Sequence, residues 1–566
     1  MRHIFIYILL LSSVLCGSAQ NHPTDYFQAP LDIPLILSGT FGELRSNHFH
    51  AGIDIKTQGS SGHKVYAVAD GYVSRIKVSP WGYGKALYIT HPNGYTSVYA
   101  HLSKYHGSIE EYVKKAQYNE ESFTIELFPG KEELVVKKGD IVAFSGNSGS
   151  SAAPHLHFEL RTSKNEFPQN GLHFGFDIAD DIAPIIREIK VNPRGKKSQV
   201  NQQELGKFFK PTKKGNIYKI EKPILVHGKV SVGIYTHDLL NGANNKNGVY
   251  SVDLNIDGNQ IYYHKMDEFG FHETRYINSH IDYAEKQLSN KRIHSCFLEV
   301  NNPLSIYEHV ENNGVIDVDS THQGKFTIKD VYGNTSELHF ILKASDYIPP
   351  NNSKISTPTA ATFPYQEANI FINEGIEIHI PKNALYDTLQ FQYSVSPDTP
   401  STCYAPIHHV HNENTAIHKS YAISIESTLG STLKDKAFIA QINKNGKLTY
   451  RGGKWVNNKL TTKLKSFGGF SVAVDTIAPT IKGLNIYPGK TMTSSAIRMT
   501  IKDDLSGIKS YRGEIDDNWI LMEFDPKRAR LTHYFEKELE RGKHTFNLEV
   551  TDDKNNKSYY KAEFIY

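Results

Sequence analysis

Short runs of alternating apolar and polar residues recur along the chain, and this period of two predicts strands. In the run 155–160, three apolar residues alternate with His155, His157 and Glu159. On a strand these three polar side chains share one face, whereas on a helix the two histidines would lie about 200° apart and could not reach one ion. The Gly/Ser-rich stretch before Pro154 predicts a turn that leads into this strand. We therefore expect a short strand that presents two imidazoles on one face.

Other stretches carry the same strand signals. The run 65–77 alternates along its length. Asn93-Gly94 separates the β-rich runs 86–90 and 95–101, and an Asp-Gly pair follows the run 250–256. Asn-Gly and Asp-Gly pairs between such runs are the strongest short-range signals of a β-hairpin. The chain is therefore predicted to be all-β and multi-domain.

Two further polar motifs precede the strand with two histidines. His50 and Asp54 are four positions apart and share a face on a strand and on a helix alike, and the residues between them favour extended structure. In the run 99–102, Tyr99 and His101 are expected on the face opposite their apolar neighbours. A catalytic zinc centre takes three nitrogen or oxygen ligands and leaves one position open for water. The chain offers five candidates, two more than such a centre needs: His50, Asp54, His101, His155 and His157.

The order of these motifs is specific. The chain reads His-x-x-x-Asp at 50–54, Tyr-Ala-His-Leu at 99–102, and Gly-Asn-Ser-Gly followed by Pro-His-Leu-His-Phe-Glu within 146–159. In this order the motifs resemble those of the lysostaphin/LytM-type zinc metalloendopeptidases, a family of peptidoglycan hydrolases. The resemblance extends over about residues 38–172. It implies a LytM-type antiparallel β-sheet peptidase domain, one Zn²⁺ per chain, and peptidoglycan peptides as substrate.

The resemblance also implies a role for each candidate. By position, His50, Asp54 and His157 correspond to the zinc ligands. His101 and His155 correspond to the uncoordinated catalytic histidines, which act on the metal-bound water and the developing oxyanion. Every motif position is filled, which argues against the metal-free regulatory members of the family. The chain holds no His-Glu-x-x-His motif whose glutamate could be the base, so histidine must carry out the proton transfer.

Two functions stay open at this point. The first is an exported zinc metalloendopeptidase that hydrolyses peptide bonds in peptidoglycan stems or cross-links. The alternative is a non-catalytic cell-wall-binding or hydrolase-activating LytM-like protein that keeps its groove for recognition. A protein partner that docks on the modules outside the peptidase-like region is compatible with either function.

The first residues predict export. A short basic start, an apolar run at 4–15 and small residues at 17–19 are typical of a secretory signal peptide over 1–19, cut after Ala19. Cys16 raises the alternative of a lipoprotein, but the preceding residue is a leucine where a lipid-attachment signal favours a small side chain. No later stretch is long and apolar enough to span a bilayer. We therefore expect a periplasmic, cell-envelope or secreted protein.

The 566 residues suffice for several domains, and an internal repeat marks two of them. Asp-Ile-Ala-Pro at 181–184 matches Thr-Ile-Ala-Pro at 476–479, and Asp-x-x-x-Asn-x-Ser occurs at both 330–336 and 552–558. Such repeats among short β-rich runs predict two immunoglobulin-like β-sandwiches. The expected division is a zinc peptidase domain at 20–180 with its core at 38–172, an immunoglobulin-like β-sandwich at 181–345, a β-sandwich of unassigned type at 346–474, and a C-terminal immunoglobulin-like β-sandwich at 475–566.

The segment 105–136 is a longer connection than a minimal domain of this family needs. Ser108-Ile-Glu-Glu fits a capping box, and apolar residues at helical spacing follow it. Strands are expected at 123–128 and 133–136. Because the segment directly follows the strand of His101, we expect it to form one wall of the substrate groove or, alternatively, a peripheral decoration.

Composition narrows the function classes. The net charge is only +3, and no Lys/Arg run is interleaved with aromatic residues, which argues against a nucleic-acid partner. Cys296 and Cys403 fall in different predicted modules, so we expect two isolated thiols. His91 is expected to be structural and the cluster at 408–411 to be incidental surface histidines. Glu159 either orients an imidazole or faces solvent.

Residues beside the first motif and three acidic turns are further candidates. His48 is expected to be structural or to support a ligand, and Arg45 and Asn47 are candidates for substrate contact. The turns at Asp238, Asp504 and 552–553 are expected to close on their own backbone, with calcium binding as the alternative.

Overall fold

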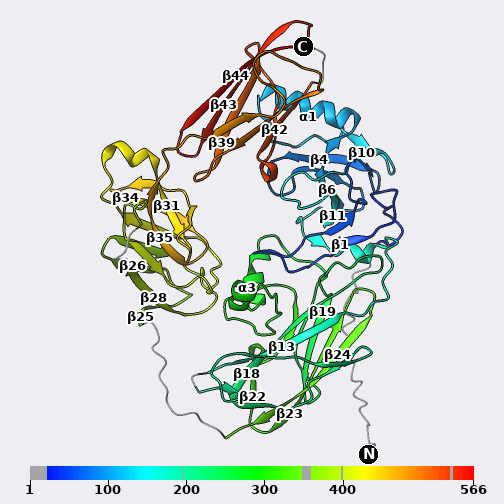
Figure 1. Cartoon of the computed structure of the whole chain (residues 1–566). Coiled ribbons are helices and arrows are strands. Elements are labelled where there is room, and N and C mark those ends of the chain that lie inside the picture. The colour runs from blue at the N-terminus through cyan, green and yellow to red at the C-terminus, as the bar shows by residue number, and fades with distance from the viewer. Residues whose placement is uncertain (1–21, 196, 347–357, 397–399, 536–538) are drawn as a thin grey trace, which may run out of the picture.

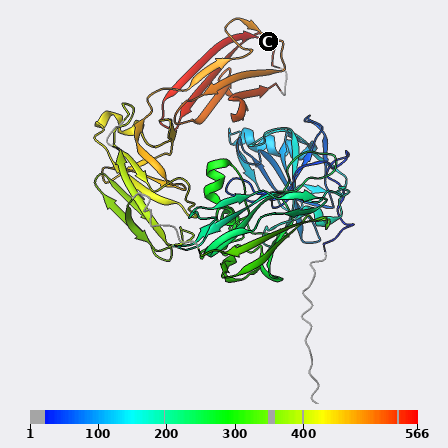
Figure 2. The same cartoon turned by 60° about the horizontal axis from the view of Figure 1, so that its bottom comes forward.

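The computed structural model describes residues 22–195, 197–346, 358–396, 400–535 and 539–566, so the predicted signal peptide over 1–19 lies outside the described residues. Nearly all regular structure consists of strands, which confirms the all-β class. Four parts follow one another around a ring in Figure 1, and Figure 2 shows the first two parts side by side. We call them the N-terminal part (22–180), the second part (181–346), the third part (358–475) and the C-terminal part (476–566). Among the described residues, no helix is long and apolar enough to cross a membrane.

The N-terminal part is built on one large sheet and one small sheet. The large sheet runs in the order β1 (Leu37–Gly39), β2 (Ile53–Lys56), β11 (His155–Thr162), β6 (Tyr95–Leu102), β5 (Lys85–Thr90), β4 (Gly71–Val78) and β8 (Ile125–Leu127). Two short strands flank it, β12 (Pro168–Gln169) beside β11 and β9 (Val135–Val136) beside β4. The small sheet runs β3 (Lys64–Tyr66), β10 (Ile141–Phe144) and β7 (Lys104–Tyr105).

The alternation of β11 follows from its position between core and surface. Leu156, Phe158 and Leu160 are almost fully buried in the core, and each contributes about 1.5–3 kcal/mol on burial. The intervening polar side chains therefore point to the other face of the sheet, as the period of two predicts. β5 and β6 pair antiparallel across Asn93-Gly94, so the predicted hairpin is confirmed.

The run 65–77 is two strands rather than one. β3 belongs to the small sheet and β4 to the large sheet, with a bend between them. Val65 and Val73 nevertheless bury their side chains in the same core. Because β3 and β4 both bury one face in this core, the alternation of apolar and polar residues continues across the bend. The sequence alone therefore suggests a single strand.

The segment 105–136 contains the predicted helix, α1 (Gly107–Asn119), and the short strands β8 and β9. The prediction of a capping box at Ser108 is wrong, because the N-cap residue is His106, two positions earlier, and no side chain caps the helix. The Glu110 carboxylate instead accepts the backbone N–H of Tyr105 at 3.0 Å. β8 and β9 pair with β4, which is three strands away from β11 in the sheet order.

The second part contains a twelve-stranded sheet and two short helices. Its strands are β13 (Ile185–Pro193), β14 (Gln199–Val200), β15 (Lys207–Phe209), β16 (Thr212–Lys214), β17 (Ile217–Lys219), β18 (Ile224–His237), β19 (Ser251–Ile256), β20 (Asn259–Lys265), β21 (Tyr307–Val310), β22 (Ile316–Val318), β23 (Thr321–Lys329) and β24 (Thr335–Ala344). The helices are α2 (Ile277–His280) and α3 (Tyr283–Ser289). At the β19–β20 turn, Asp257 and Gly258 both have positive φ (51° and 84°), as a two-residue hairpin of this twist requires.

The third and C-terminal parts each contain two sheets. In the third part these are β25 (Thr359–Phe363), β28 (Leu389–Ser396), β29 (Ile407–Val410), β35 (Gly468–Val474), β31 (Ala437–Ile442) and β32 (Leu448–Tyr450), and β26 (Asn369–Asn373), β27 (Ile376–Ile380), β30 (Tyr421–Glu426), β34 (Lys459–Leu464) and β33 (Lys454–Val456). In the C-terminal part they are β36 (Thr480–Gly483), β38 (Ala496–Lys502), β42 (Arg530–Tyr534) and β41 (Glu523–Asp525), and β37 (Lys490–Thr491), β44 (Lys557–Ile565), β43 (Lys543–Asp552), β39 (Ile508–Ile515) and β40 (Asn518–Trp519).

The internal repeat makes the same contacts in both copies. The Asn334 amide donates to the Asp330 carboxylate at 2.7 Å, and the Asn556 amide donates to the Asp552 carboxylate at 2.7 Å. Each asparagine also donates to the backbone carbonyl of the aspartate directly before its copy, Asp180 at 3.1 Å and Asp475 at 3.0 Å. The two copies therefore fold their closing turn in the same way, although the second part is much longer.

Contacts between successive parts close the ring. The first two parts share an apolar cluster that includes Phe41, Phe49 and Phe269. Arg275 of the second part donates to backbone carbonyls of the third part. The third part contacts the C-terminal part through Lys436, which donates to the Lys554 carbonyl at 2.8 Å.

The C-terminal part in turn contacts the N-terminal part. The Lys85 ammonium lies 2.7 Å from the Glu523 carboxylate. Lys527 donates to the Ser151 carbonyl at 3.0 Å, on the loop that leads into β11. The ring of Tyr118, at the end of α1, lies edge-on to Trp519.

Candidate metal centre

His50, Asp54 and His157 converge at one point of the large sheet. The register of β2 against β11 places Asp54 opposite His157, and His50 lies just before β2. The His50 Nε2 and His157 Nδ1 atoms lie 3.0 Å apart, and the Asp54 Oδ1 atom lies 3.0 Å and 2.9 Å from them. All three residues are buried. The structure thus brings together three side chains that the sequence separates by a hundred residues.

The outer nitrogen of each histidine fixes its tautomer. The His50 Nδ1 atom lies 2.8 Å from the Thr40 carbonyl oxygen, which can only accept, so Nδ1 carries the proton. The His157 Nε2 atom likewise donates to the Glu159 carboxylate at 2.7 Å. Two imidazole lone pairs and a carboxylate oxygen therefore face one another. Such a set of acceptors requires a positive charge between them, and its nitrogen and oxygen atoms fit a zinc ion.

The pKa values support a cation site at this point. Burial disfavours the charged form of His157, yet its hydrogen bonds to Asp54 and Glu159 raise its pKa to about 9. Burial alone would also raise the pKa of Asp54, but the charge of His50 and hydrogen bonds from the histidines hold it well below its usual value. Without a metal, a proton on His157 therefore supplies the positive charge at this point, and a bound metal ion would displace that proton and face the lone pair.

Glu159 holds His157 in place and is itself held by two other side chains. It accepts from the Tyr83 hydroxyl at 2.5 Å and from the Arg161 Nε atom at 2.6 Å, and it is almost completely buried. Burial would raise the pKa of Glu159, but the charge of Arg161 and the hydrogen bond from His157 lower it to about 2. Of the two roles considered for Glu159, orientation of an imidazole is therefore the one that the structure supports.

The alternation of polar and apolar residues along β6 does not predict the position of His101 beside the centre. In β6, two residues, Ala100 and His101, lie opposite the single residue Ala86 of β5, and this arrangement is a β-bulge. His101 has a left-handed backbone with φ of 59°. Tyr99 instead points into the core, where its hydroxyl accepts the Val68 N–H at 3.0 Å. The prediction that Tyr99 and His101 share a face is wrong, because the bulge turns the histidine to the other side.

His101 and His155 border the cluster. Their ring centroids lie 4.8 Å apart, and the His155 Nε2 atom lies 3.4 Å from the Asp54 Oδ1 atom. The Nδ1 atoms of both rings donate to backbone carbonyls, of Ser148 and Ala153, at 2.9 Å each. Burial and the neighbouring histidines lower the pKa of His101 to about 3, so this ring is neutral at physiological pH. The His155 side chain is 15% exposed against 4% for His157, so His155 is the more accessible of the two.

Arg45 contacts the centre from the side away from the histidines. Its Nη2 atom lies 2.9 Å from the Asp54 Oδ2 atom and 2.8 Å from the Glu43 carboxylate. One oxygen of Asp54 thus pairs with the guanidinium and the other faces the two imidazoles. The sequence marked Arg45 as a candidate for substrate contact, but no residue spacing indicated that it binds a ligand candidate. Asn47, the other such candidate, accepts from Asn278 of the second part at 3.0 Å.

A pocket of about 500 Å³ adjoins the centre on the same face of the sheet. Tyr83 connects the two, because its ring stacks on that of His157 while its edge lines the pocket. One lining residue, Phe271, comes from the second part. The principal lining side chains are Arg75, Trp81, Tyr83, Tyr88, Arg161 and Phe271. The pocket has aromatic and basic walls, and it meets the centre through Tyr83, since none of the five candidate residues lines it.

The other candidates fall outside this centre. His91 bonds the Asp70 carbonyl and the Ser97 hydroxyl, as a structural histidine does. The interpretation of the 408–411 cluster as surface residues is wrong for His408, which is buried. Cys296 and Cys403 are free thiols, as predicted.

The acidic turns of the C-terminal part close on their own backbone. Asp552 accepts the N–H groups of Lys554 and Asn556 at 2.8 Å, and Asp503, rather than the expected Asp504, accepts that of Gly507 at 2.7 Å. These contacts fit the turn-forming interpretation.

Residues 48–118 match the family model described as peptidase family M23, and residues 360–475 match that of a Zu5-like domain. An uncharacterized metalloprotease of Haemophilus influenzae is 36% identical over 111 residues, which are 20% of this chain and 18% of that protein. The DD-carboxypeptidase/endopeptidase Mpg of Neisseria meningitidis is 34% identical over 118 residues, or 21% of each chain. This chain thus spans about a fifth of the length of these curated relatives.

Two further similarities cover the same region. The glycyl-glycine endopeptidase ALE-1 of Staphylococcus capitis is 26% identical over 173 residues, which are 30% of this chain and 37% of that protein. Among solved structures, the catalytic domain of the prophage-encoded M23 protein EnpA from Enterococcus faecalis is 25% identical, with a TM-score of 0.18 over 25% of this chain and 87% of that one.

Proposed function

The chain carries a domain of peptidase family M23, and on this basis we propose that it is an exported zinc metalloendopeptidase that hydrolyses peptide bonds in peptidoglycan stems or cross-links. The observation that carries the proposal is the convergence of two imidazole lone pairs and a carboxylate oxygen within 3.0 Å of one another. Similarity to proteins named as endopeptidases, including the peptidoglycan DD-endopeptidase ShyB of Vibrio cholerae at 32% identity, supports the choice of substrate.

In this proposal His50, Asp54 and His157 hold one zinc ion per chain. When bound, zinc supplies Lewis-acid chemistry that polarises a peptide carbonyl and makes a water molecule more acidic. Arg45 holds the outer oxygen of Asp54, so the carboxylate keeps one oxygen directed at the ion. Glu159 and the Thr40 carbonyl keep both ligand imidazoles in the required tautomer, as supporting groups around zinc sites commonly do.

His155 and His101 carry out the proton chemistry in this proposal. Their Nδ1 atoms are committed to backbone carbonyls, so each presents Nε2 as the atom that can accept or return a proton. His155 is the more exposed ring and takes the proton from the attacking water. His101 is neutral and more buried, and its Nε2 lone pair accepts a hydrogen bond that orients the attacking water. The proton that His155 takes up then stabilises the developing oxyanion and is returned to the leaving amine. Positioned proton transfer of this kind contributes about 10²–10⁴-fold to a rate.

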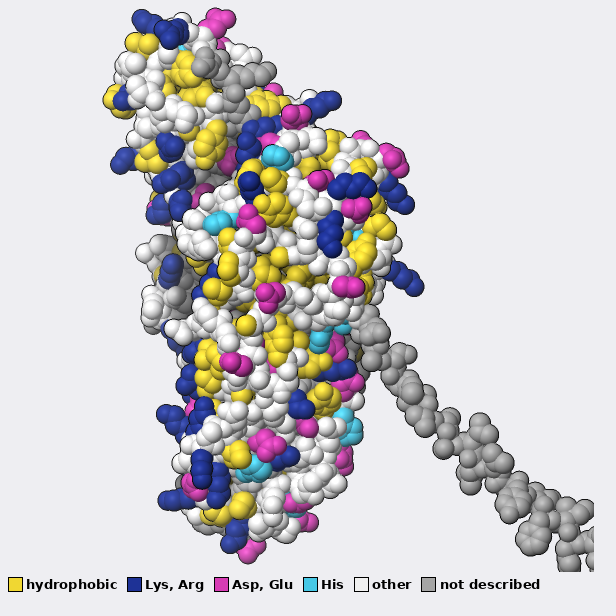
Figure 3. All heavy atoms as spheres, turned by 90° about the vertical axis from the view of Figure 1, so that its right-hand side faces the viewer, with side chains coloured by type: hydrophobic (Ala, Val, Ile, Leu, Met, Phe, Trp, Pro, Cys, Tyr) yellow, Lys and Arg dark blue, Asp and Glu magenta, His cyan; other side chains and the backbone are white. Residues whose placement is uncertain are grey.

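In this proposal the parts outside the peptidase domain contribute to substrate binding and position the enzyme on its substrate. We propose that the chain divides into domains at the boundaries expected from the sequence, with a signal peptide at 1–19. Phe271 of the second part lines the pocket beside Arg161, so substrate contacts extend beyond the peptidase domain. On the face seen in Figure 3, basic and acidic side chains are interspersed rather than gathered by sign, which suits a neutral or mixed-charge partner better than a polyanion.

The experiment that tests this function combines metal analysis with product identification. The purified chain is expected to contain zinc at the centre formed by His50, Asp54 and His157, which we call the M23 centre, and to release muropeptides from purified sacculi. Mass spectrometry of the products from defined muropeptides identifies the bond that is cleaved. A chain that binds zinc and sacculi but releases no muropeptide would instead support the alternative, a non-catalytic wall-binding or hydrolase-activating protein.

A further inference from the structure

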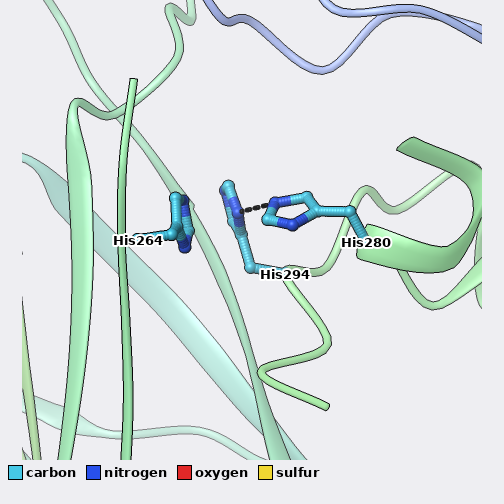
Figure 4. Close-up of side chains that lie close together, drawn as sticks. All are labelled: His264, His280 and His294. Carbon is cyan, nitrogen blue, oxygen red and sulfur yellow. Dashed lines mark hydrogen bonds between the residues drawn. The ribbon is translucent and has the colours of Figure 1, made fainter. Parts of the chain in front are cut away.

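Three histidines converge inside the second part, away from the M23 centre. His264 lies on β20, His280 ends α2, and His294 pairs through its backbone with Ile234 of β18. Figure 4 shows the three rings close together, each from a separate segment, with His294 hydrogen-bonded to His280 and the ring of His264 stacked beside that of His294. One ring nitrogen of each residue lies within 4.8 Å of those of the other two, and all three side chains are buried.

His264 carries the strongest indication of a ligand. It is completely buried, yet neither ring nitrogen has a hydrogen-bond partner among the described residues. A neutral imidazole has one N–H donor and one lone pair, and leaving a buried polar group unpaired costs about 1–3 kcal/mol. A cation that accepts the lone pair would relieve part of this cost.

His280 and His294 are hydrogen-bonded to each other, and a metal bound between them would replace the proton that they share. The His280 Nε2 atom lies 2.9 Å from the His294 Nδ1 atom, and the His280 Nδ1 atom lies 3.1 Å from the Tyr307 hydroxyl. One nitrogen of His280 is thus held by an outer partner while the other points inward, as in metal-bound imidazoles. Backbone bonds fix both residues: His294 exchanges two bonds of 2.9 Å with Ile234, and the Ser295 N–H donates to the His280 carbonyl at 3.0 Å.

The protonation state also suits metal binding. Burial lowers the pKa of His294 to about 4, and burial together with the neighbouring rings lowers those of His264 and His280 further below the usual value. All three rings are therefore neutral at physiological pH, and the neutral imidazole is the form that binds metals.

We propose that His264, His280 and His294 form a second, structural metal site that holds one divalent transition-metal cation such as zinc. A set of three imidazoles suits zinc, copper or nickel, whereas calcium and magnesium require oxygen ligands. The site joins β20, α2 and the segment around His294. The ring of Phe49, which directly precedes His50, lies 5.6 Å from that of His280, so the metal would stabilise the surface on which the His50 loop rests. This proposal does not depend on the proposed peptidase function.

Metal analysis of the full chain tests the proposal once the M23 centre is disabled. His157→Ala is loaded with Zn²⁺, dialysed against buffer and analysed by inductively coupled plasma mass spectrometry. We expect about one equivalent of zinc to remain. His157→Ala combined with His264→Leu should lose it, while His157→Ala combined with His309→Leu, which changes an exposed histidine on β21 of the same part, should keep it.

Two results would overturn the second site. One is a His157→Ala chain that retains no zinc, and the other is retained zinc that survives His264→Leu. Circular dichroism checks that each variant is folded. If the double variant does not fold, zinc-edge X-ray absorption of His157→Ala decides alone: three imidazole nitrogens around the metal are expected, and an oxygen-dominated shell contradicts the site.

Discussion

At the residue scale, the chemistry of this chain depends on which nitrogen of each histidine faces the centre. The sequence marked all five candidate residues through the order of their motifs, but strand alternation explains the shared face only for His155 and His157 on β11. It could not identify the tautomers, since these follow from acceptors far away in the chain, such as the Thr40 carbonyl and Glu159. Nor could it predict the bulge at His101, because a left-handed backbone at a histidine leaves no mark in the pattern of polar and apolar residues.

Single substitutions separate metal binding from proton transfer. His155→Ala should keep zinc at the M23 centre, since its ring borders the cluster without belonging to it, and should lower cleavage by about 10²–10⁴-fold. His157→Ala should lose the zinc of this centre, so that total zinc falls by one equivalent relative to the unmodified chain, and should also lose cleavage. Zinc content and muropeptide release are measured on the same preparations. Loss of this zinc in His155→Ala would show that the roles are divided differently.

A buried carboxyl in the second part makes stability depend on pH. Burial and the neighbouring Asp180 and Asp330 raise the pKa of Asp238 to about 8, against about 3.9 in an unfolded chain. The protonated Asp238 carboxyl stabilises the fold fully below pH 4. This contribution to the free energy of unfolding is lost as the pH rises toward 8, because the carboxyl ionises in the unfolded chain while it is still protonated in the folded one. Asp238→Asn removes this titration, so its melting temperature should increase relative to that of the unmodified chain between pH 5 and pH 8. A constant difference across this range in differential scanning calorimetry would contradict the assignment.

At the element scale, β11 determines the arrangement of the centre, and the sequence predicted it well. Its apolar residues enter the core and its polar residues meet β2, so one period-two pattern specifies both burial and site. The period-two pattern failed in the run 65–77, where two strands share one core. The capping-box motif failed at α1, which no side chain caps. The segment 105–136 also lies beside β4 and contacts the C-terminal part, a position that fits a support for that part better than a wall beside β2 and β11.

The buried pair formed by Glu159 and Arg161 should control both folding and metal affinity. Glu159→Gln removes the buried charged partner of Arg161 and leaves it only the half-exposed Glu166, which costs up to about 3–5 kcal/mol, and it weakens the group that orients His157. Loss of such an orienting group lowers metal affinity by about 10–100-fold. Chemical denaturation and zinc competition titrations measure the two effects.

Glu166→Gln is the matched control, because it removes the exposed partner of the same arginine. The Glu166 side chain is half exposed and its pair is worth about 0–1 kcal/mol, so both quantities should change little. Equal effects of the two substitutions would mean that burial of Glu159 is unimportant.

At the scale of the whole molecule, the C-terminal part returns to the N-terminal part and touches the loop before β11. Three charged side chains of the C-terminal part contact the N-terminal part: Arg512 pairs with Glu121, Glu523 pairs with Lys85, and Lys527 donates to the Ser151 carbonyl. Replacing all three with alanine should release the C-terminal part and increase the radius of gyration measured by small-angle X-ray scattering, while zinc content stays the same. Asp504→Ala, which breaks an exposed pair within the C-terminal part, is the control. Unchanged scattering from the triple variant would show that these contacts do not maintain the ring.

The account as a whole depends on one zinc ion held by His50, Asp54 and His157, and anomalous diffraction at the zinc edge from crystals of the full chain tests this most directly. The expected result is a peak about 2.0–2.2 Å from the His50 Nε2, Asp54 Oδ1 and His157 Nδ1 atoms, with a fourth position free of protein ligands. Absence of density between these atoms, or an ion surrounded by four protein ligands there, would contradict it.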